Sequence, residues 1–325
     1  MLDRNGQVTD RALRLGELAR AMQMHRFELW QARKEPLVGV LYDWENEAVW
    51  AVMSIVGRES FRLKPVEARI GVSRALINAN IPFEYVTPDD LHHGLAPRYP
   101  IIYLPAMLAL QTEVLDKLAD YVRQGGRVVM DLPSAWYDEF TQRFPTGKET
   151  KFAEAFGVSL DDFQYSGVNR TLRLGGEKLD GFVATLTPIT ARVLARYDNG
   201  LPAVVENRLD RGTSVLLAFE ASLACHRPGH QAAEKRLVDY ALTDSKPPYR
   251  CDEAIVYRLA TPESDHYFLV NDGPARKVRL TLASSRKAQR VTDAVTGEIL
   301  DPNQPIELDA HDARWLRYQV ENTVE

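Results

Sequence analysis

Short apolar runs alternate with helix-like stretches through the first half of this chain, and no other feature constrains the fold as strongly. Strands are expected at residues 37–42, 83–87, 101–104 and 127–131, and helices at residues 47–56, 65–79 and 113–124. Strands separated by helices of this length favour a parallel sheet with right-handed crossovers. We therefore predict an α/β fold, with a mostly parallel sheet flanked by helices.

The pattern changes after about residue 152, where short strand-like segments replace the regular alternation. These segments and one helix are expected at residues 172–174, 182–186, 203–207, 214–219 and 231–242. We assign them to the far edge of the same domain. Pro247 and Pro248 then stop the helix and stiffen a short linker, which makes this region the best domain boundary.

No helical pattern is visible after Arg250, and turn signals separate the remaining apolar runs. Strands are expected at residues 254–259, 265–271, 277–281, 289–292, 305–308 and 313–318. This spacing predicts a small antiparallel β-sandwich. At the other end, residues 10–33 have the periodicity of one amphipathic helix. The predicted division is a helical segment at 1–35, an α/β domain at 36–245 and a β-sandwich at 250–325.

Composition excludes several classes of function. The formal net charge is −5, and cations and anions are mixed along the chain, which argues against a nucleic-acid-binding face. No apolar run approaches the roughly 20 residues that span a bilayer, and the first residues lack the apolar core of a signal peptide. Cys225 and Cys251 are expected to be reduced thiols. We therefore expect a cytoplasmic protein without nucleic-acid or membrane partners.

Residues 36–46, PLVGVLYDWEN, closely resemble the opening strand of the trimerisation domain of family-42 glycoside hydrolases, the β-galactosidases. The resemblance is also specific at residues 99–131 and is looser at residues 150–250. Residues 2–33 resemble the last turn and helix of that family's catalytic barrel. Residues 250–325 resemble the small C-terminal β-domain of many glycoside hydrolases, here with the segment DAVTGE.

The resemblance implies an oligomerisation and assembly region that supports β-galactoside hydrolysis by a barrel outside this chain. It implies a homotrimer and a barrel domain or chain as partners. The two carboxylates that a retaining glycosidase needs lie in the barrel in this family. No catalytic, cofactor-binding or metal-binding residue is therefore carried over to this sequence, and no cofactor is expected.

Five residues near strand ends are candidates for an interface or for the rim of a cleft: Asp43, Trp44, Glu45, Asn46 and Trp136. The carboxyl ends of parallel strands are where α/β sheets bind ligands. Acidic residues also stabilise the start of a helix, and aromatic side chains anchor interfaces or stack on sugars. For the acidic residues we favour the structural role, and for Trp44 a contact with a partner subunit or with the barrel.

Two alternative functions remain open. A stand-alone hydrolase would use the sheet's carboxyl edge, with Asp43, Glu45, Asp131 and Ser134 nearby. The fold resembles class I glutamine amidotransferases, but the turn after the fourth strand carries Ser134 and no cysteine, which argues against that activity. A carbohydrate-binding module would need exposed aromatic residues on the sandwich, where the candidates are Tyr257, Tyr267, Phe268, Trp315 and Tyr318.

Metal and nucleotide sites are not supported by the sequence. His92 and His93 are expected in a polar loop, and Cys225, His226 and His230 lack the spacing of a zinc site. Gly175 and Gly176 are expected to turn a hairpin, since neither a dinucleotide-binding nor a phosphate-binding loop motif surrounds them.

Overall fold

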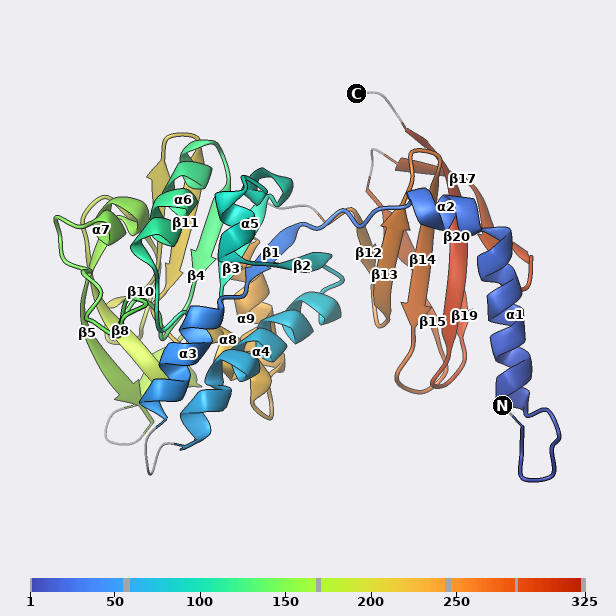
Figure 1. The fold of residues 1–325 in the computed structure, drawn as a ribbon, viewed down its shortest axis with the longest axis horizontal. Helices are drawn as coiled ribbons and strands as arrows, with labels where there is room; N and C mark the ends of the chain where they lie inside the picture. The colour runs from blue at the N-terminus through green and yellow to red at the C-terminus, as the bar shows by residue number, and fades with distance from the viewer. Residues whose placement is uncertain (1, 55–58, 168–170, 243–246, 284–285, 323–325) are drawn as a thin grey trace. The chain divides into compact units, whose positions relative to one another are not determined.

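The computed structural model describes residues 2–54, 59–167, 171–242, 247–283 and 286–322. The chain divides into two compact units, which are described separately (Figure 1). The α/β unit comprises residues 36–245. The β unit combines residues 1–35 with residues 246–325. Both ends of the chain therefore belong to one unit, and the α/β unit lies between them in sequence.

The α/β unit is built on a mixed seven-stranded sheet in the order β2-β1-β3-β4-β11-β10-β9. Its strands are β1 (Val38–Leu41), β2 (Phe83–Val86), β3 (Ile101–Leu104), β4 (Arg127–Met130), β9 (Arg192–Arg196), β10 (Pro202–Leu209) and β11 (Gly212–Leu217). The pairs from β2 to β11 are parallel, whereas β10 runs antiparallel to both β11 and β9. The predicted mixed α/β fold with a parallel-rich sheet is confirmed.

The helices of this unit are α3 (Trp44–Met53), η1 (Glu59–Leu63), α4 (Lys64–Asn78), α5 (Pro88–His92), η2 (Ala96–Arg98), α6 (Thr112–Arg123), α7 (Lys151–Phe156), α8 (Ala221–His226) and α9 (Gln231–Ala241). Helix α4 lies on the connection from β1 to β2, and α6 lies on the connection from β3 to β4. These connections move in opposite directions across the sheet, so right-handed crossovers place α4 and α6 on opposite faces (Figure 1). Strands β1 and β3 are buried along their whole length, which explains their continuous apolar sequence.

Two small strand pairs complete the α/β unit. Strand β5 (Val158–Ser166) pairs with β8 (Gly181–Pro188), and β6 (Leu172–Leu174) pairs with β7 (Glu177–Leu179). Gly175 and Gly176, both at positive φ, turn the β6–β7 hairpin as expected. The sequence prediction missed β5, β7 and β9, and it also missed α5, α7 and α8. Each of these three helices has at most six residues, too few to show a helical period.

The β unit contains a five-stranded antiparallel sheet in the order β13-β14-β20-β17-β18 and two further strand pairs. Its strands are β12 (Tyr249–Cys251), β13 (Ile255–Ala260), β14 (Ser264–Val270), β15 (Arg276–Val278), β16 (Leu280–Leu282), β17 (Arg286–Asp293), β18 (Ile299–Leu300), β19 (Ile306–Leu308) and β20 (Ala313–Asn322). Among the five aromatic candidates for sugar binding, Tyr267, Trp315 and Tyr318 are buried, and Phe268 stacks on Trp315. Tyr257 alone of these five is exposed, so they do not form a flat aromatic platform.

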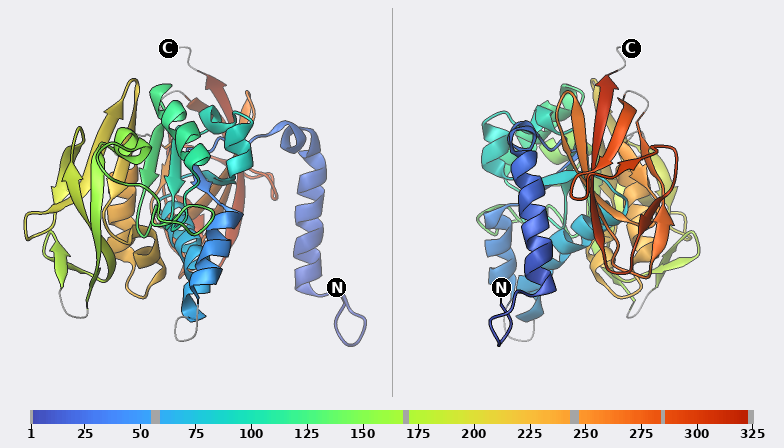
Figure 2. Two further views of the ribbon diagram at one scale, coloured as in Figure 1. Left: turned by 60° about the vertical axis from the view of Figure 1, so that its left-hand side comes forward. Right: turned by 90° about the vertical axis from the view of Figure 1, so that its right-hand side faces the viewer.

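The N-terminal helix packs on this same β unit. Residues 10–33 were expected as one helix, but the structure divides them into α1 (Asp10–Met24) and α2 (Arg26–Gln31), with a break at His25. Residues at and beyond the break contact β20: the His25 ring lies edge-on to Trp315, and Glu28 in α2 forms a two-pronged ion pair with Arg317 at 2.7 and 2.6 Å. Ala21 of α1 packs against Trp315, and in the right-hand view of Figure 2 the dark-blue helix runs alongside the red strands.

Candidate interface at the carboxyl edge of the sheet

Asp43 caps helix α3 directly after strand β1. Its Oδ1 accepts a hydrogen bond from the backbone N–H of Glu45 at 2.9 Å, and Gln111 donates to its Oδ2 at 3.4 Å. The cap explains why α3 begins at Trp44, three residues before the expected start. Burial is the main cause that raises the pKa of this carboxyl, and the negative charge of Glu139 adds to it. The geometry of Asp43 is that of a buried helix cap.

Asn46 fastens α3 to the loop that follows β3. Its Oδ1 accepts from the backbone N–H of Ala109 at 3.1 Å, and its Nδ2 donates to the carbonyl of Ala106 at 3.5 Å. Trp50 donates to the same carbonyl at 3.2 Å. Since Asn46 is buried, its amide serves this internal junction and is closed to a partner molecule.

Trp44 and Glu45 differ from these two residues because both are exposed, Trp44 by 70% of its surface. Burial, Asp43 and Glu139 all raise the pKa of Glu45, which places Glu139 in the same electrostatic neighbourhood. Phe140 follows Glu139 and is 72% exposed. We call Trp44, Glu45, Glu139 and Phe140 the edge patch. Glu139 and Phe140 were missed by the sequence interpretation, although a large apolar residue beside an acid after β4 was a readable signal.

Trp136 has a different environment from Trp44. Its half-buried ring lies against Phe163 of β5 at 4.2 Å and Phe182 of β8 at 4.9 Å between centroids. Within the described part of the chain, its buried Nε1 has no hydrogen-bond acceptor. Trp136 therefore packs the loop after β4 onto the β5–β8 pair. Its ring is less exposed to solvent than the ring of Trp44.

Asp131 and Ser134, the groups that a stand-alone hydrolase would need, are both completely buried. Asp131 accepts hydrogen bonds from the backbone N–H groups of Ala106, at 2.8 Å, and Ser222, and from the hydroxyl of Tyr103 at 3.2 Å. Burial raises its pKa to about 6.

The hydroxyl of Ser134 is also used internally. It donates to the carbonyl of Asp131 at 2.5 Å and accepts from the backbone N–H of Met107 at 2.9 Å. These contacts join the loops after β3 and β4 to the start of α8, and they leave neither side chain open to a substrate.

The remaining candidate residues from the sequence do not come together in one site either. His92 ends helix α5, contrary to the expected loop, because Thr87 and Asp90 cap that helix reciprocally. Cys225 and Cys251 are buried and do not form a disulfide, and burial raises the pKa of Cys251 to about 11. Within the residues that the structure describes, no group of three or more His, Cys, Asp or Glu side chains could hold a metal ion. No helix in those ranges is long and apolar enough to cross a membrane.

A mixed, parallel-rich sheet flanked by helices defines an α/β domain, in which Asp131 and Ser134 at the carboxyl edge are held in buried polar contacts. The particular family follows from sequence comparison. The family of the β-galactosidase trimerisation domain matches residues 37–239, and the chain belongs to this family.

Curated relatives are β-galactosidases of low sequence identity. Pbg of Clostridium perfringens is 28% identical over 202 residues, which is 57% of this chain and 28% of that protein. GalA of Bacillus licheniformis is 22% identical over 270 residues, which is 81% of this chain and 39% of that protein. The chain thus spans about a quarter to two fifths of the length of these relatives.

Solved structures agree on the fold. The β-galactosidase of Bacillus circulans sp. alkalophilus matches 98% of this chain and 46% of its own, with a TM-score of 0.76 and 19% identity. An α-L-fucosidase isoenzyme of Paenibacillus thiaminolyticus matches 99% of this chain and 54% of its own, with a TM-score of 0.67 and 12% identity. Since one fold occurs in enzymes named for different sugars, the fold by itself does not specify the sugar.

Proposed function

We propose that this chain is the oligomerisation and assembly region of a β-galactosidase-like glycoside hydrolase, and that a barrel outside it hydrolyses the β-galactoside. The observation that carries the proposal is the family match over residues 37–239. The internal use of Asp131 and Ser134 supports it, because the carboxyl edge of the sheet offers neither group to a substrate. The amidotransferase-like class of the α/β unit is part of this proposal, supported by the sheet order.

The edge patch is proposed to contact a second copy of the chain, or the rim of its neighbour's cleft, in a ring that closes as a homotrimer. A heterologous interface joins two different surfaces and closes when the rotation between copies matches the ring. Trp44 and Phe140 supply exposed aromatic area of the kind that anchors such contacts, and Glu45 and Glu139 favour a cationic counterpart. Asp43, Asn46 and Trp136 are proposed to hold this surface in position.

Residues 1–35 are proposed to be the exit from the barrel, followed by the trimerisation domain at 36–245 and the β-domain at 250–325. Ala21 is the one residue of α1 that is fully buried, so most of this helix faces outward. Large exposed apolar residues of α1 and α2 are Leu13, Leu15, Leu18, Met22, Met24, Phe27 and Trp30. A surface of this kind marks an interaction site, and we assign it to the barrel. Cys225 and Cys251 are buried and do not form a disulfide, which supports a cytoplasmic location.

The proposal is tested by light scattering on the purified chain over a wide concentration range, with nitrophenyl-β-galactoside turnover assayed on the same samples. We expect a mass of three times 36.8 kDa, about 110 kDa, and no turnover without a barrel. The double variant Trp44→Ser/Phe140→Ser should lower the mass towards the monomer. Tyr257→Ser, which removes an exposed aromatic of the β unit, is the matched control and should remain a trimer. A monomer that turns over the galactoside would overturn the proposal.

A further inference from the structure

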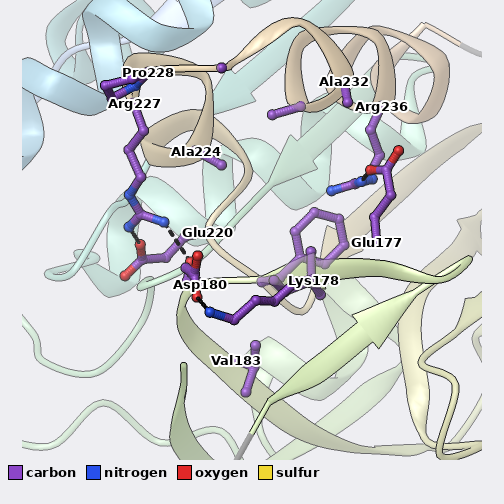
Figure 3. A pocket seen from close by; sticks show the side chains of 14 residues that line it. Glu177, Lys178, Asp180, Val183, Glu220, Ala224, Arg227, Pro228, Ala232 and Arg236 are labelled. Atoms are coloured by element: carbon purple, nitrogen blue, oxygen red, sulfur yellow. Dashed lines mark hydrogen bonds and ion pairs between the residues drawn. The ribbon is translucent and has the colours of Figure 1, made fainter. Parts of the chain in front are cut away.

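A separate pocket of about 220 Å³ lies in the α/β unit beyond the end of strand β11 (Figure 3). The β6–β7 hairpin, strand β8, the turn between α8 and α9, and helix α9 contribute its walls. It shares no lining residue with the edge patch. Because β11 runs parallel to β4, this pocket lies at the carboxyl end of a parallel strand, where open α/β sheets bind ligands.

The charges that line the pocket balance one another. Three ion pairs surround it, each joining a carboxylate to a cation: Glu177 with Arg236, Asp180 with Lys178, and Glu220 with Arg227. A ligand with a net charge would leave one charge uncompensated in this partly enclosed space, which is costly. The lining therefore suits a neutral ligand that both donates and accepts hydrogen bonds.

The polar frame of the pocket is held by hydrogen bonds within the protein. Glu220, only 5% exposed, accepts from the backbone N–H of Phe182 at 2.9 Å and from Arg227, which also donates to the carbonyl of Asp180 at 2.5 Å. Gly181 allows this arrangement, since a Cβ there would lie 2.1 Å from a carboxylate oxygen of Glu220. Figure 3 shows Arg227 reaching both Glu220 and the Asp180 segment. Preorganised groups lose little entropy on binding.

Hydrogen-bonding capacity remains on Arg236. Its guanidinium carries five N–H donors, and Glu177 is its one hydrogen-bond partner within the described ranges. Burial lowers the pKa of Arg236, so the group has already lost part of its hydration. A hydroxyl that accepts from Arg236 and donates to a neighbouring carboxylate would satisfy both groups at once.

The rest of the lining is mostly apolar, with Val183, Phe219, Ala224, Ala232 and Ala233 beside the ion pairs. The volume lies below the roughly 300–1,000 Å³ of pockets for drug-sized ligands, which limits the ligand to about one ring. We propose that this pocket binds a neutral, polyhydroxylated ligand the size of a single sugar ring. Its hydroxyl groups bridge carboxylate and guanidinium, and its C–H face lies on the apolar wall. The proposal does not depend on oligomeric state or on a barrel.

The test is saturation-transfer NMR and calorimetry on the full chain, with D-galactose as the neutral probe and inorganic phosphate and acetate as anionic probes. We expect saturable binding of galactose alone. Ala232→Phe fills the exposed mouth and Arg236→Met removes the guanidinium, and each should weaken binding by at least about tenfold, the equivalent of one charged hydrogen bond. Lys235→Met is the matched control, because Lys235 pairs with Asp239 on the same helix and does not line this pocket.

Three results would overturn the proposal: binding of phosphate or acetate in place of galactose, galactose binding that Ala232→Phe leaves unchanged, or no saturable polyol signal up to about 0.1 M. Circular dichroism of each variant establishes that it folds. Since Ala232 is exposed, its replacement tests occupancy of the pocket without disturbing the core.

Discussion

Replacing Asp131 tests whether its buried carboxylate holds the carboxyl edge of the α/β sheet together. In Asp131→Ala, the backbone N–H groups of Ala106 and Ser222 and the hydroxyl of Tyr103 lose their common acceptor inside the protein. A buried donor left unpaired costs about 1–3 kcal/mol. The hydroxyl of Tyr103 can rotate, and water can enter the space that the Asp131 side chain leaves. The free-energy cost therefore comes mainly from the two backbone N–H groups. The expected loss is about 4 kcal/mol of the free energy of unfolding, much of a typical total of 5–15 kcal/mol.

The chain has two compact units, so a single global unfolding energy does not describe it. Hydrogen exchange read by mass spectrometry measures opening locally, in peptides that cover β3, β4 and α8. The free energy of local opening, obtained from the exchange rates, should fall most in Asp131→Ala and less in Asp131→Asn, which keeps one oxygen. In Tyr103→Phe, which removes one donor, it should fall by about 1 kcal/mol. Peptides of the β unit are the internal control. A change below about 1 kcal/mol in Asp131→Ala would refute the reasoning, because this is the expected effect of a single ordinary hydrogen bond.

Three further outcomes follow from the structure. Burial raises the pKa of Asp131 from 3.8 to about 6, so the part of the stability that depends on its protonation is complete below pH 3.8 and is lost as the pH rises through 6; urea titrations from pH 4 to 7 should show this decline in the α/β unit of the wild type but not in Asp131→Ala. Gly181→Ala should cost about 2–4 kcal/mol because its Cβ meets a buried carboxylate, whereas Gly176→Ala, also at positive φ but facing open space, should cost about 1 kcal/mol in thermal unfolding. Glu28→Gln weakens the pair with Arg317, which is partly exposed, so a loss of about 1 kcal/mol and faster proteolysis near α2 are expected; unchanged digestion would show that the pair does not hold the helix.

The strands of the parallel sheet could be predicted because burial on both faces leaves a continuous apolar run, and residues 101–104 became β3 without a shift. The break at His25 was not predicted, since no glycine or proline marks it, and the contact that fixes α2 joins Glu28 to Arg317, 289 positions away in sequence. Helix α5 has a readable capping box but is only five residues long.

At the candidate site, the sequence showed which types of side chain follow the strands, but it did not show which of them are exposed to solvent. An Asp after an apolar strand gives the same sequence pattern whether it faces solvent, caps a helix as Asp43 does, or accepts hydrogen bonds from three donors as Asp131 does. The edge patch shows the same limit, because Glu139 joins Asp43 and Glu45 only after the loop beyond β4 has folded back. Contacts between loops that are distant in sequence depend on the tertiary fold, so a local sequence pattern does not predict them.

The β unit is assembled from both ends of the chain, and this has a consequence for synthesis. Helix α2 leaves the ribosome long before β20, the strand that carries its ion-pair partner Arg317. At about 5–20 residues per second, the roughly 280 residues between them take on the order of 10–60 s to appear. The whole α/β unit can fold during that interval, before Arg317 is available to Glu28. During that interval α1 and α2 lack the contacts that Ala21 and Glu28 make in the folded β unit, and chaperones that bind apolar segments have that time to reach them.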